Sequence, residues 1–315
     1  MQTSRLEVFR EPPTPRDTYI GLSGILTLKL KALTYIHVGS GTEALSIPED
    51  IDLIVKGKSF EGAAKELGSR MATDFIKNMS ISGKPCIPAS TMKGRTRTRI
   101  ELTIPPRKDG RRWSCFSKAS PPQNANRPTA WRHRKLYGNV VLENRGPACD
   151  LTRGNTVCLT CDMFGTAGLQ GLVSFSDFKA GQNTLENVAG EFNIKLQALK
   201  PETELSGRVY FRNLSKPRLG LLLYGLGICG SPSGDRILVG RLKYRGMLAR
   251  KPFGTVTTIL TEVLFSKVLD KLEGVVPDTS IAGNRLTELC ATLWQSAVNE
   301  YDLRMFNEVQ RIGRA

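Results

Sequence analysis

The sequence of 315 residues has no apolar run approaching the ~20 residues that a membrane span requires. Its longest apolar stretch, residues 219–229, is too short and contains three glycines. The N-terminal residues have no apolar segment typical of a secretion signal, so we expect a cytoplasmic location. Acidic residues are scarce as well, with 29 Asp and Glu against 45 Lys and Arg, a net charge of +16. This imbalance favours a polyanionic partner.

The basic residues are concentrated in one part of the chain. Residues 93–135 contain thirteen Lys and Arg but only two acidic residues, Glu101 and Asp109. This stretch therefore supplies +11 of the +16. Solvated loops usually mix charges of both signs, so the clustering indicates a binding surface.

Seven cysteines in a chain without a secretion signal are expected to be reduced thiols. Three of them stand alone in apolar surroundings and are typical of core residues: Cys86, Cys229 and Cys290. The other four lie in a polar segment rich in proline, glycine and arginine: Cys115, Cys149, Cys158 and Cys161. Hydrophobic packing alone could not bury such a segment, so the four thiolates predict a structural zinc site, with His133 as a spare ligand.

Hydrophobic periodicity predicts strands at residues 23–38, 75–77, 172–177, 192–199, 203–213 and 254–260. Helices are expected at residues 91–102, where Ser90 is the candidate N-cap, and at residues 217–227, 262–273 and 285–312. Residues 103–157 contain six prolines and little periodicity, which indicates an insertion folded around the metal. On the helix at residues 91–102, Lys93 and Arg97 share one face, and Arg95 and Arg99 share a second.

The order strand, helix, strand, strand, helix, strand predicts an α+β fold: a ferredoxin-like, RRM-like antiparallel sheet with helices on one face. We divide the chain into an N-terminal arm (1–20), a core (21–104 and 162–260), a basic zinc-binding insertion or lid (105–161) and a C-terminal helical extension (261–315). The architecture alone does not predict a function.

Four motifs resemble the RAMP proteins that form the repeated backbone of type III CRISPR interference complexes, and most of all the Csm backbone type. The most specific is Pro-Cys-Ile-Pro-Ala-Ser-Thr-Met-Lys-Gly-Arg at residues 85–95, which is similar to the strand-to-helix junction of that family. The other three are the turn at residues 35–41, the Cys-x-x-Cys and Phe-Gly run at 158–165 followed by residues 172–177, and the glycine-rich loop at 238–246 followed by 253–256.

The resemblance implies that the chain stacks along a guide RNA beside other subunits of the complex and neighbouring copies of itself or its paralogues. A helix N-terminus offers free amides and a positive dipole end to phosphate, and glycines allow the backbone to approach the ribose-phosphate chain. The expected RNA-binding residues are His37, Gly39, Gly41, Ser90, Thr91, Lys93, Arg95, Arg97, Arg99, Gly240, Arg241 and Lys243.

The resemblance also implies cleavage of the paired target RNA at regular intervals by an aspartate, with Mg²⁺ or Mn²⁺. Two positions compete for that role: Asp74, which directly precedes residues 75–77, and Asp52, which better matches the distance from His37. Two departures bear on cleavage, since Ala89 replaces the usual glycine and the segment at residues 179–191 is short.

Two alternatives remain at this point. One is a scaffold subunit of the same complex that binds guide RNA without cutting. The other is a stand-alone endoribonuclease that trims precursor RNA. That chemistry generally uses a His or Tyr as acid-base partner, and the chain has only two histidines, His37 and His133.

Overall fold

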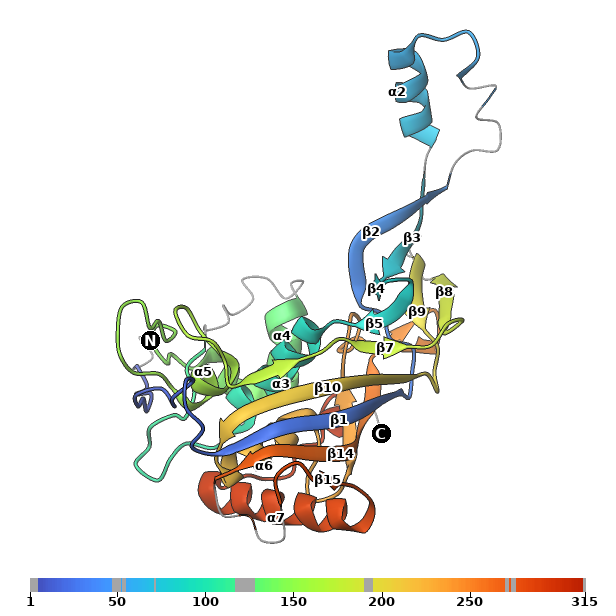
Figure 1. The fold of residues 1–315 in the computed structure, drawn as a ribbon. Helices are drawn as coiled ribbons and strands as arrows, with labels where there is room; N and C mark the ends of the chain where they lie inside the picture. The colour runs from blue at the N-terminus through green and yellow to red at the C-terminus, as the bar shows by residue number, and fades with distance from the viewer. Residues whose placement is uncertain are drawn as a thin grey trace.

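A long antiparallel sheet forms the body of the computed structural model, and helices cover one of its faces (Figure 1). The structure describes residues 5–46, 52, 55–70, 72–116, 128–189, 195–269, 272 and 276–313. None of the helices within these residues is both long and apolar enough to span a bilayer.

The strands of the main sheet follow the order β11-β14-β1-β10-β7-β5-β4, with every pair antiparallel. In addition, β6 pairs with β10 and β15 pairs with β14. The strands are β1 (Leu22–Ala32), β4 (Ser80–Ile81), β5 (Lys84–Ile87), β6 (Val173–Phe175), β7 (Phe178–Ala180), β10 (Glu204–Leu214), β11 (Ser233–Leu238), β14 (Thr255–Val268) and β15 (Ser280–Ile281).

The core lies between the sheet and two helices, α3 (Ala89–Thr103) and α6 (Lys216–Leu226). Alternate residues of β1 and β10 are buried, because successive side chains of a strand point to opposite faces. Helix α7 (Gly283–Tyr301) packs on α6, and α8 (Glu308–Arg311) packs near β11.

A second sheet carries an arm that extends away from the body (Figure 1). Its strand order is β2-β3-β9-β8, and β3 pairs with β9 in parallel. Helix α2 (Phe60–Arg70) lies at the outer end of the arm, between β2 and β3 in the chain. The strands are β2 (Gly39–Ser46), β3 (Ala72–Asn78), β8 (Leu185–Ala189) and β9 (Lys195–Leu199).

The segment between α3 and β6 contains three short helices: α4 (Pro128–Tyr137), the 3-10 helix η1 (Gly138–Leu142) and α5 (Leu159–Phe164). The N-terminal residues are paired with this segment. Val8 bridges Arg112, and Glu11 bridges Val157 through two backbone hydrogen bonds of 2.8 and 3.0 Å. A small hairpin, β12 (Met247–Leu248) with β13 (Lys251–Pro252), follows the glycine-rich loop.

The expected α+β class with an antiparallel sheet is confirmed, but several boundaries were wrong. Residues 262–268 continue strand β14 and are not helical. The register of β14 against β1 shifts beside Thr27, and this irregularity breaks the period of two that a strand shows in its sequence. Helix α7 ends at Tyr301, where Asp302 adopts a left-handed conformation with φ 51°.

Two further expectations were wrong for local reasons. Residues 103–157, in which little periodicity was found and no helix was expected, contain α4 and η1. Helix α3 begins at Ala89, with Pro88 and not Ser90 as its N-cap. Proline has a fixed φ near −65° and no amide hydrogen, so it can precede the first turn without leaving a donor unpaired.

Candidate nucleic-acid interface and metal centre

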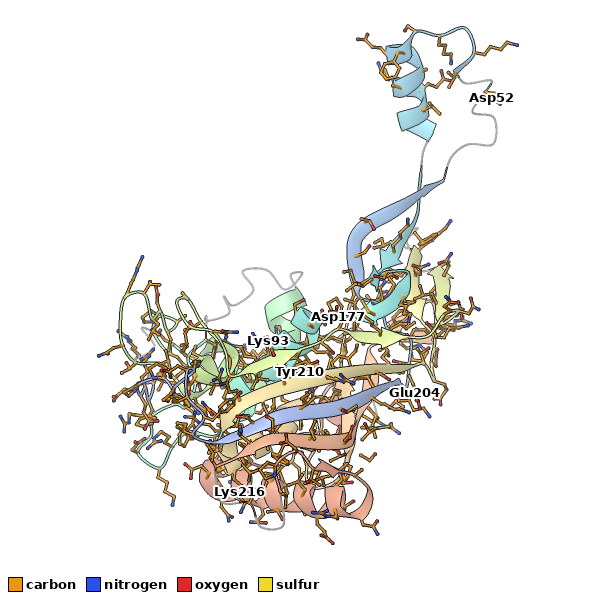
Figure 2. The ribbon with its side chains drawn as sticks, viewed as in Figure 1. Asp52, Lys93, Asp177, Glu204, Tyr210 and Lys216 are labelled. Carbon is orange, nitrogen blue, oxygen red and sulfur yellow. The ribbon has the colours of Figure 1, made fainter. Side chains whose placement is uncertain are left out.

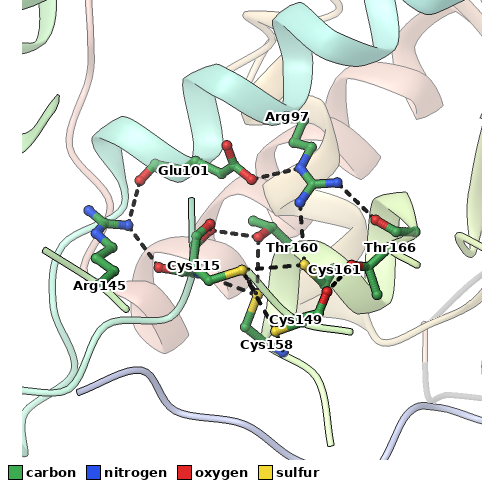
Figure 3. A network of polar contacts seen from close by, with 11 residues as sticks. Arg97, Glu101, Cys115, Arg145, Cys149, Cys158, Thr160, Cys161 and Thr166 are labelled. Carbon is green, nitrogen blue, oxygen red and sulfur yellow. Dashed lines mark hydrogen bonds and ion pairs between the residues drawn. The ribbon is translucent and has the colours of Figure 1, made fainter. Parts of the chain in front are cut away.

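Four buried cysteine sulfurs form one cluster, with all four Sγ atoms within 4.8 Å of one another (Figure 3). Cys115 Sγ lies 3.7 Å from Cys149 Sγ, 3.5 Å from Cys161 Sγ and 3.6 Å from Cys158 Sγ. Four sulfurs at about 2.3 Å from a central zinc are about 3.8 Å apart in a tetrahedron. They are too far apart for disulfides, which join sulfurs at about 2.05 Å. The cluster could therefore hold a metal such as zinc.

The backbone around the cluster fixes the positions of the sulfurs. Cys158 is the N-cap of α5, which places Cys161 one turn further along the same helix. The amide of Cys115 donates to Cys158 Sγ at 3.4 Å, and the amide of Cys158 donates to Cys149 Sγ at 3.3 Å. Val8 and Val157 pack against the four cysteines, so the N-terminal residues form one wall of the cluster.

Two arginines donate hydrogen bonds to the cluster. Arg10 Nε lies 3.3 Å from Cys149 Sγ, and Arg97 Nη2 lies 3.3 Å from Cys161 Sγ. Arg97 also donates to Glu101 at 2.6 Å and to the carbonyl of Gly165 at 2.8 Å (Figure 3). A zinc ion with four thiolates has a net charge of −2, which two guanidinium groups would offset. The structure thus places Arg97 at the cysteine cluster, a role that the sequence did not indicate.

The start of helix α3 faces a carboxylate from the neighbouring strands. The amide of Ala89 donates to Asp177 Oδ1 at 2.8 Å, and the amides of Thr91 and Met92 bond to the carbonyl of Pro88. Among the described residues, the Ser90 amide has no hydrogen-bond partner. Asp177 ended a predicted strand, and nothing in its sequence position indicated that it would anchor this helix.

The turn after β1 and the glycine-rich loop lie side by side. The amide of Arg241 donates to the carbonyl of His37 at 2.8 Å, and the two residues form a bridge. Gly240 has φ +83°, and a Cβ at this position would lie 2.6 Å from His37 O. Because such a contact is sterically forbidden, only glycine allows the loop to approach this closely.

A cavity of about 310 Å³ lies between the start of α3, helix α4 and the glycine-rich loop. It brings together residues from three of the segments expected to bind RNA or to surround the metal. The pKa of Lys243 is lowered, mainly because burial disfavours its charged form and in second place because the charge of Arg95 repels it. Burial, followed by the charge of Arg97, likewise lowers the pKa of Lys93 one turn into α3. The lining includes Ser90, Thr91, Gly94, Arg95, His133, Tyr137, Lys243 and Tyr244.

Arg95 and Arg99 are buried and do not form a surface for phosphate, which corrects the expectation for this face of α3. Both donate to Oε1 of Glu308, at 2.6 and 2.7 Å, and Glu308 Oε2 accepts from the amide of Leu238 at 2.9 Å. Burial would raise the pKa of Glu308, but the two guanidinium groups outweigh it, and the pKa is lowered.

Both histidines have positions that differ from the expected ones. His37 is fully buried, and its Nδ1 lies 2.6 Å from the carbonyl oxygen of Gln197, so its ring does not reach the surface. Burial lowers its pKa. His133 lies between the rings of Tyr137 and Tyr244, with centroids 6.0 and 5.0 Å away, and not at the cysteine cluster. It lines the cavity at α3 instead.

The two candidate catalytic aspartates both belong to the arm that carries α2, not to the N-terminal arm. Asp52 is exposed near its outer end, as Figure 2 shows. Asp74 lies in β3, and its side chain is outside the described part of the structure. Of the remaining expected RNA-binding residues, Gly39 and Gly41 lie in β2, where Gly41 has φ +80°.

Comparison with known protein families identifies one family that this chain matches. A model of the RAMP superfamily matches residues 29–243. A solved structure, the crystal structure of Csc2 from Thermofilum pendens, is similar with 16% identity and a TM-score of 0.34, over 92% of this chain and 80% of that chain. No match was found among curated proteins.

Proposed function

Since the chain belongs to the RAMP superfamily, we propose that it is a guide-RNA-binding backbone subunit of a type III CRISPR complex. It stacks along the guide beside other subunits and neighbouring copies, and sequence selection is left to pairing between guide and target. The strand order β14-β1-β10-β7, with α3 after β1 and α6 after β10, supports a ferredoxin-like core of the kind that RRM domains share.

One observation carries the proposal: the start of α3 and the glycine-rich loop line the same cavity. Two features there suit a phosphate chain. The first turn of α3 has a positive dipole end; Asp177 accepts from its Ala89 amide, and its Ser90 amide has no partner in the described chain. Lys243 in the cavity, and Lys93 on another face of the first turn of α3, add positive charge at partly desolvated positions, where it interacts more strongly with an anion than in open water. Gly240 holds the loop against the turn at His37.

The cysteine cluster supports a structural zinc ion in the same subunit, held by Cys115, Cys149, Cys158 and Cys161. A bound zinc would cross-link the segment between α3 and β6. Arg97 would then join the metal site to the helix whose first turn faces the guide RNA.

A binding experiment tests the guide-RNA site. Single-stranded RNA loses affinity with rising salt at a slope of about 0.7 per phosphate contact. We expect Lys93→Ala and Lys243→Ala each to reduce that slope by about one contact, equally for all RNA sequences. The exposed Lys108, changed to Ala, is the matched control with the same loss of charge. Slopes unchanged in both variants and equal to the Lys108→Ala slope would refute the site.

We further propose that the assembled complex cuts its target RNA through Asp74, or through Asp52, with Mg²⁺ or Mn²⁺. Both residues lie on the arm and not in the cavity at α3, so guide binding and cutting are separable. In the assembled particle, Asp74→Ala or Asp52→Ala should abolish regular cleavage and leave guide binding unchanged. If neither change slows cutting, the subunit is a scaffold. Specific cleavage of repeat RNA by the purified chain alone would favour a precursor-trimming enzyme instead.

A further inference from the structure

The face of the main sheet opposite α3 and α6 has no helix over it in the described part of the chain (Figure 1). The register places four residues in one row across this face: Leu264 of β14, Ile25 of β1, Tyr210 of β10 and Ser174 of β6. The alternation along β10 confirms their direction, since Leu205, Val209 and Phe211 are buried on the other side. We call the row and its surroundings the sheet platform.

The side chain of Tyr210 lies on the sheet platform, in strand β10 (Figure 2). It is 40% exposed, although it lies near the middle of the sheet and not at an edge or in a loop. Ile25 and Leu264 are half-buried beside it, so the ring stands on an apolar base. An exposed aromatic ring on a sheet is suited to stacking on a planar partner.

A second exposed aromatic ring lies at one end of the sheet platform. Tyr19 is 46% exposed and lies three residues before Leu22, where β1 begins. The guanidinium carbon of Arg212 lies 4.6 Å from the centroid of its ring, and Lys267 Nζ lies 6.0 Å from it. Arg212 is two residues after Tyr210 on the same face of β10, a rise of about 7 Å. The ring of Tyr19 is therefore linked through Arg212 to the strand that carries Tyr210.

The charges on the sheet platform are mainly positive. Among the described residues of β1, β7, β10 and β14 and of the turn before β10, six basic side chains lie on this face or at its rim, against three acidic ones that belong to Glu202, Glu204 and Glu262. Two of the basic groups already have acidic partners, because Lys29 pairs with Glu204 at 3.0 Å and Lys31 with Glu202 at 2.6 Å. The six basic residues are Lys29, Lys31, Lys179, Arg208, Arg212 and Lys267.

We propose that the sheet platform is a second binding site for single-stranded RNA, in which bases stack on Tyr210 and Tyr19 while Arg208, Arg212 and Lys267 contact phosphates. Stacking on aromatic rings within a basic surface is a general way to bind single strands without sequence preference. A protein partner is less favoured by the same observations, because the surplus of positive charge and the interleaved rings match a polyanion that carries flat bases. The site does not depend on the cavity at α3, which is on the other side of the sheet.

The test uses the full chain and a fluorescein-labelled 12-nucleotide polyuridine RNA. Stacking contributes about 1–3 kcal/mol per base, so Tyr210→Ala should weaken binding at this site about 5- to 150-fold. Tyr210→Phe keeps the ring and should bind within about twofold of the parent. Arg208→Glu reverses an exposed charge on the same face and should weaken binding and flatten its salt dependence.

Photo-crosslinking separates this site from the one at α3. RNA carrying 4-thiouridine should cross-link to the peptide that contains Tyr210, and the cross-link should persist in Lys93→Ala. Equal affinity of Tyr210→Ala and the parent, or cross-links confined to residues lining the cavity at α3, would overturn the proposal even if guide binding at α3 is confirmed. Because Tyr210→Ala also loses packing on Ile25 and Leu264, thermal melting is measured for each variant, and Arg208→Glu, which leaves that packing intact, provides an independent test.

Discussion

Arg97 Nη2 lies 3.3 Å from Cys161 Sγ, so helix α3 is hydrogen-bonded directly to the cysteine cluster. The same guanidinium bonds to Glu101 one turn later on the helix. Helix α3, whose first turn faces the proposed guide RNA, is thus held in place by the residues of the metal centre. The arrangement connects the stability of the cluster with the position of α3.

Replacing Cys158 and Cys161 together by serine should remove the metal. We expect close to one zinc per chain in the parent protein and none in the double variant, with a clear fall in melting temperature because the metal contributes its binding energy to folding. Elemental analysis and thermal unfolding measure both quantities. A chain that contains no metal and melts at the temperature of the parent would contradict the assignment.

Arg97→Ala should lower the affinity for zinc about 10- to 100-fold, as is common when a group that bonds to a metal ligand is lost. Competition with a chromophoric chelator measures this affinity. Arg153→Ala is the matched control, because Arg153 lies in the same part of the chain with its side chain 87% exposed. Equal zinc affinity of the two variants would show that Arg97 acts only through Glu101 and the carbonyl of Gly165.

Glu308→Gln should destabilise the fold by about 3–5 kcal/mol, since it leaves Arg95 and Arg99 buried without a counter-charge. Glu204→Gln, which breaks an exposed pair with Lys29, should cost less than about 1 kcal/mol. Urea unfolding measures the difference between the two variants. A similar loss in both would contradict the buried cluster.

The contribution of Glu308 should depend on pH in a defined direction. Its pKa is lower in the folded chain than in the unfolded chain, so its stabilising effect is complete above the unfolded pKa of about 4.3 and is lost as pH falls through the folded pKa. The gap in stability between the parent and Glu308→Gln should therefore be constant near neutral pH and narrow on acidification. A stability difference between the two proteins that widens toward low pH would mean that the pKa of Glu308 is raised in the folded chain, which would contradict the prediction.

Gly240→Ala should destabilise the glycine-rich loop more than a conformational penalty alone explains. Gly110 has nearly the same backbone angle, φ +82°, but no atom within 4 Å of a Cβ, so Gly110→Ala measures the left-handed penalty of about 1–2 kcal/mol. At Gly240 the added methyl would also meet the carbonyl of His37 at 2.6 Å. Equal costs in urea unfolding would mean that the loop moves aside without penalty.

The sequence was sufficient to predict the four cysteines as one group and the antiparallel sheet with its covering helices. The spacing of the basic residues also placed Arg95 and Arg99 on one face of a helix. It could not show which face is buried, because α3 has basic residues on both faces. Their ion-pair partner, Glu308, lies more than 200 residues later in the chain. Local periodicity carries no information about such distant ion pairs.

The errors at β14 and His37 have related causes. The bulge beside Thr27 disturbs the alternation that identifies a strand, and a helical pattern then fits residues 262–268 by chance. A histidine beside glycines suggested a ligand-binding turn, whereas the carbonyl of Gln197 in a distant strand holds the ring inside. In both cases, pairing across the sheet determines the local structure.

The pairing of Val8 with Arg112 and of Glu11 with Val157 makes the surroundings of the cysteine cluster a long-range structure. Val8 packs against the four cysteines although it lies more than 100 residues before the first of them, Cys115. Assembling the cluster therefore means closing long loops of the chain, and a metal bound by the four sulfurs would offset the conformational entropy that this closure costs.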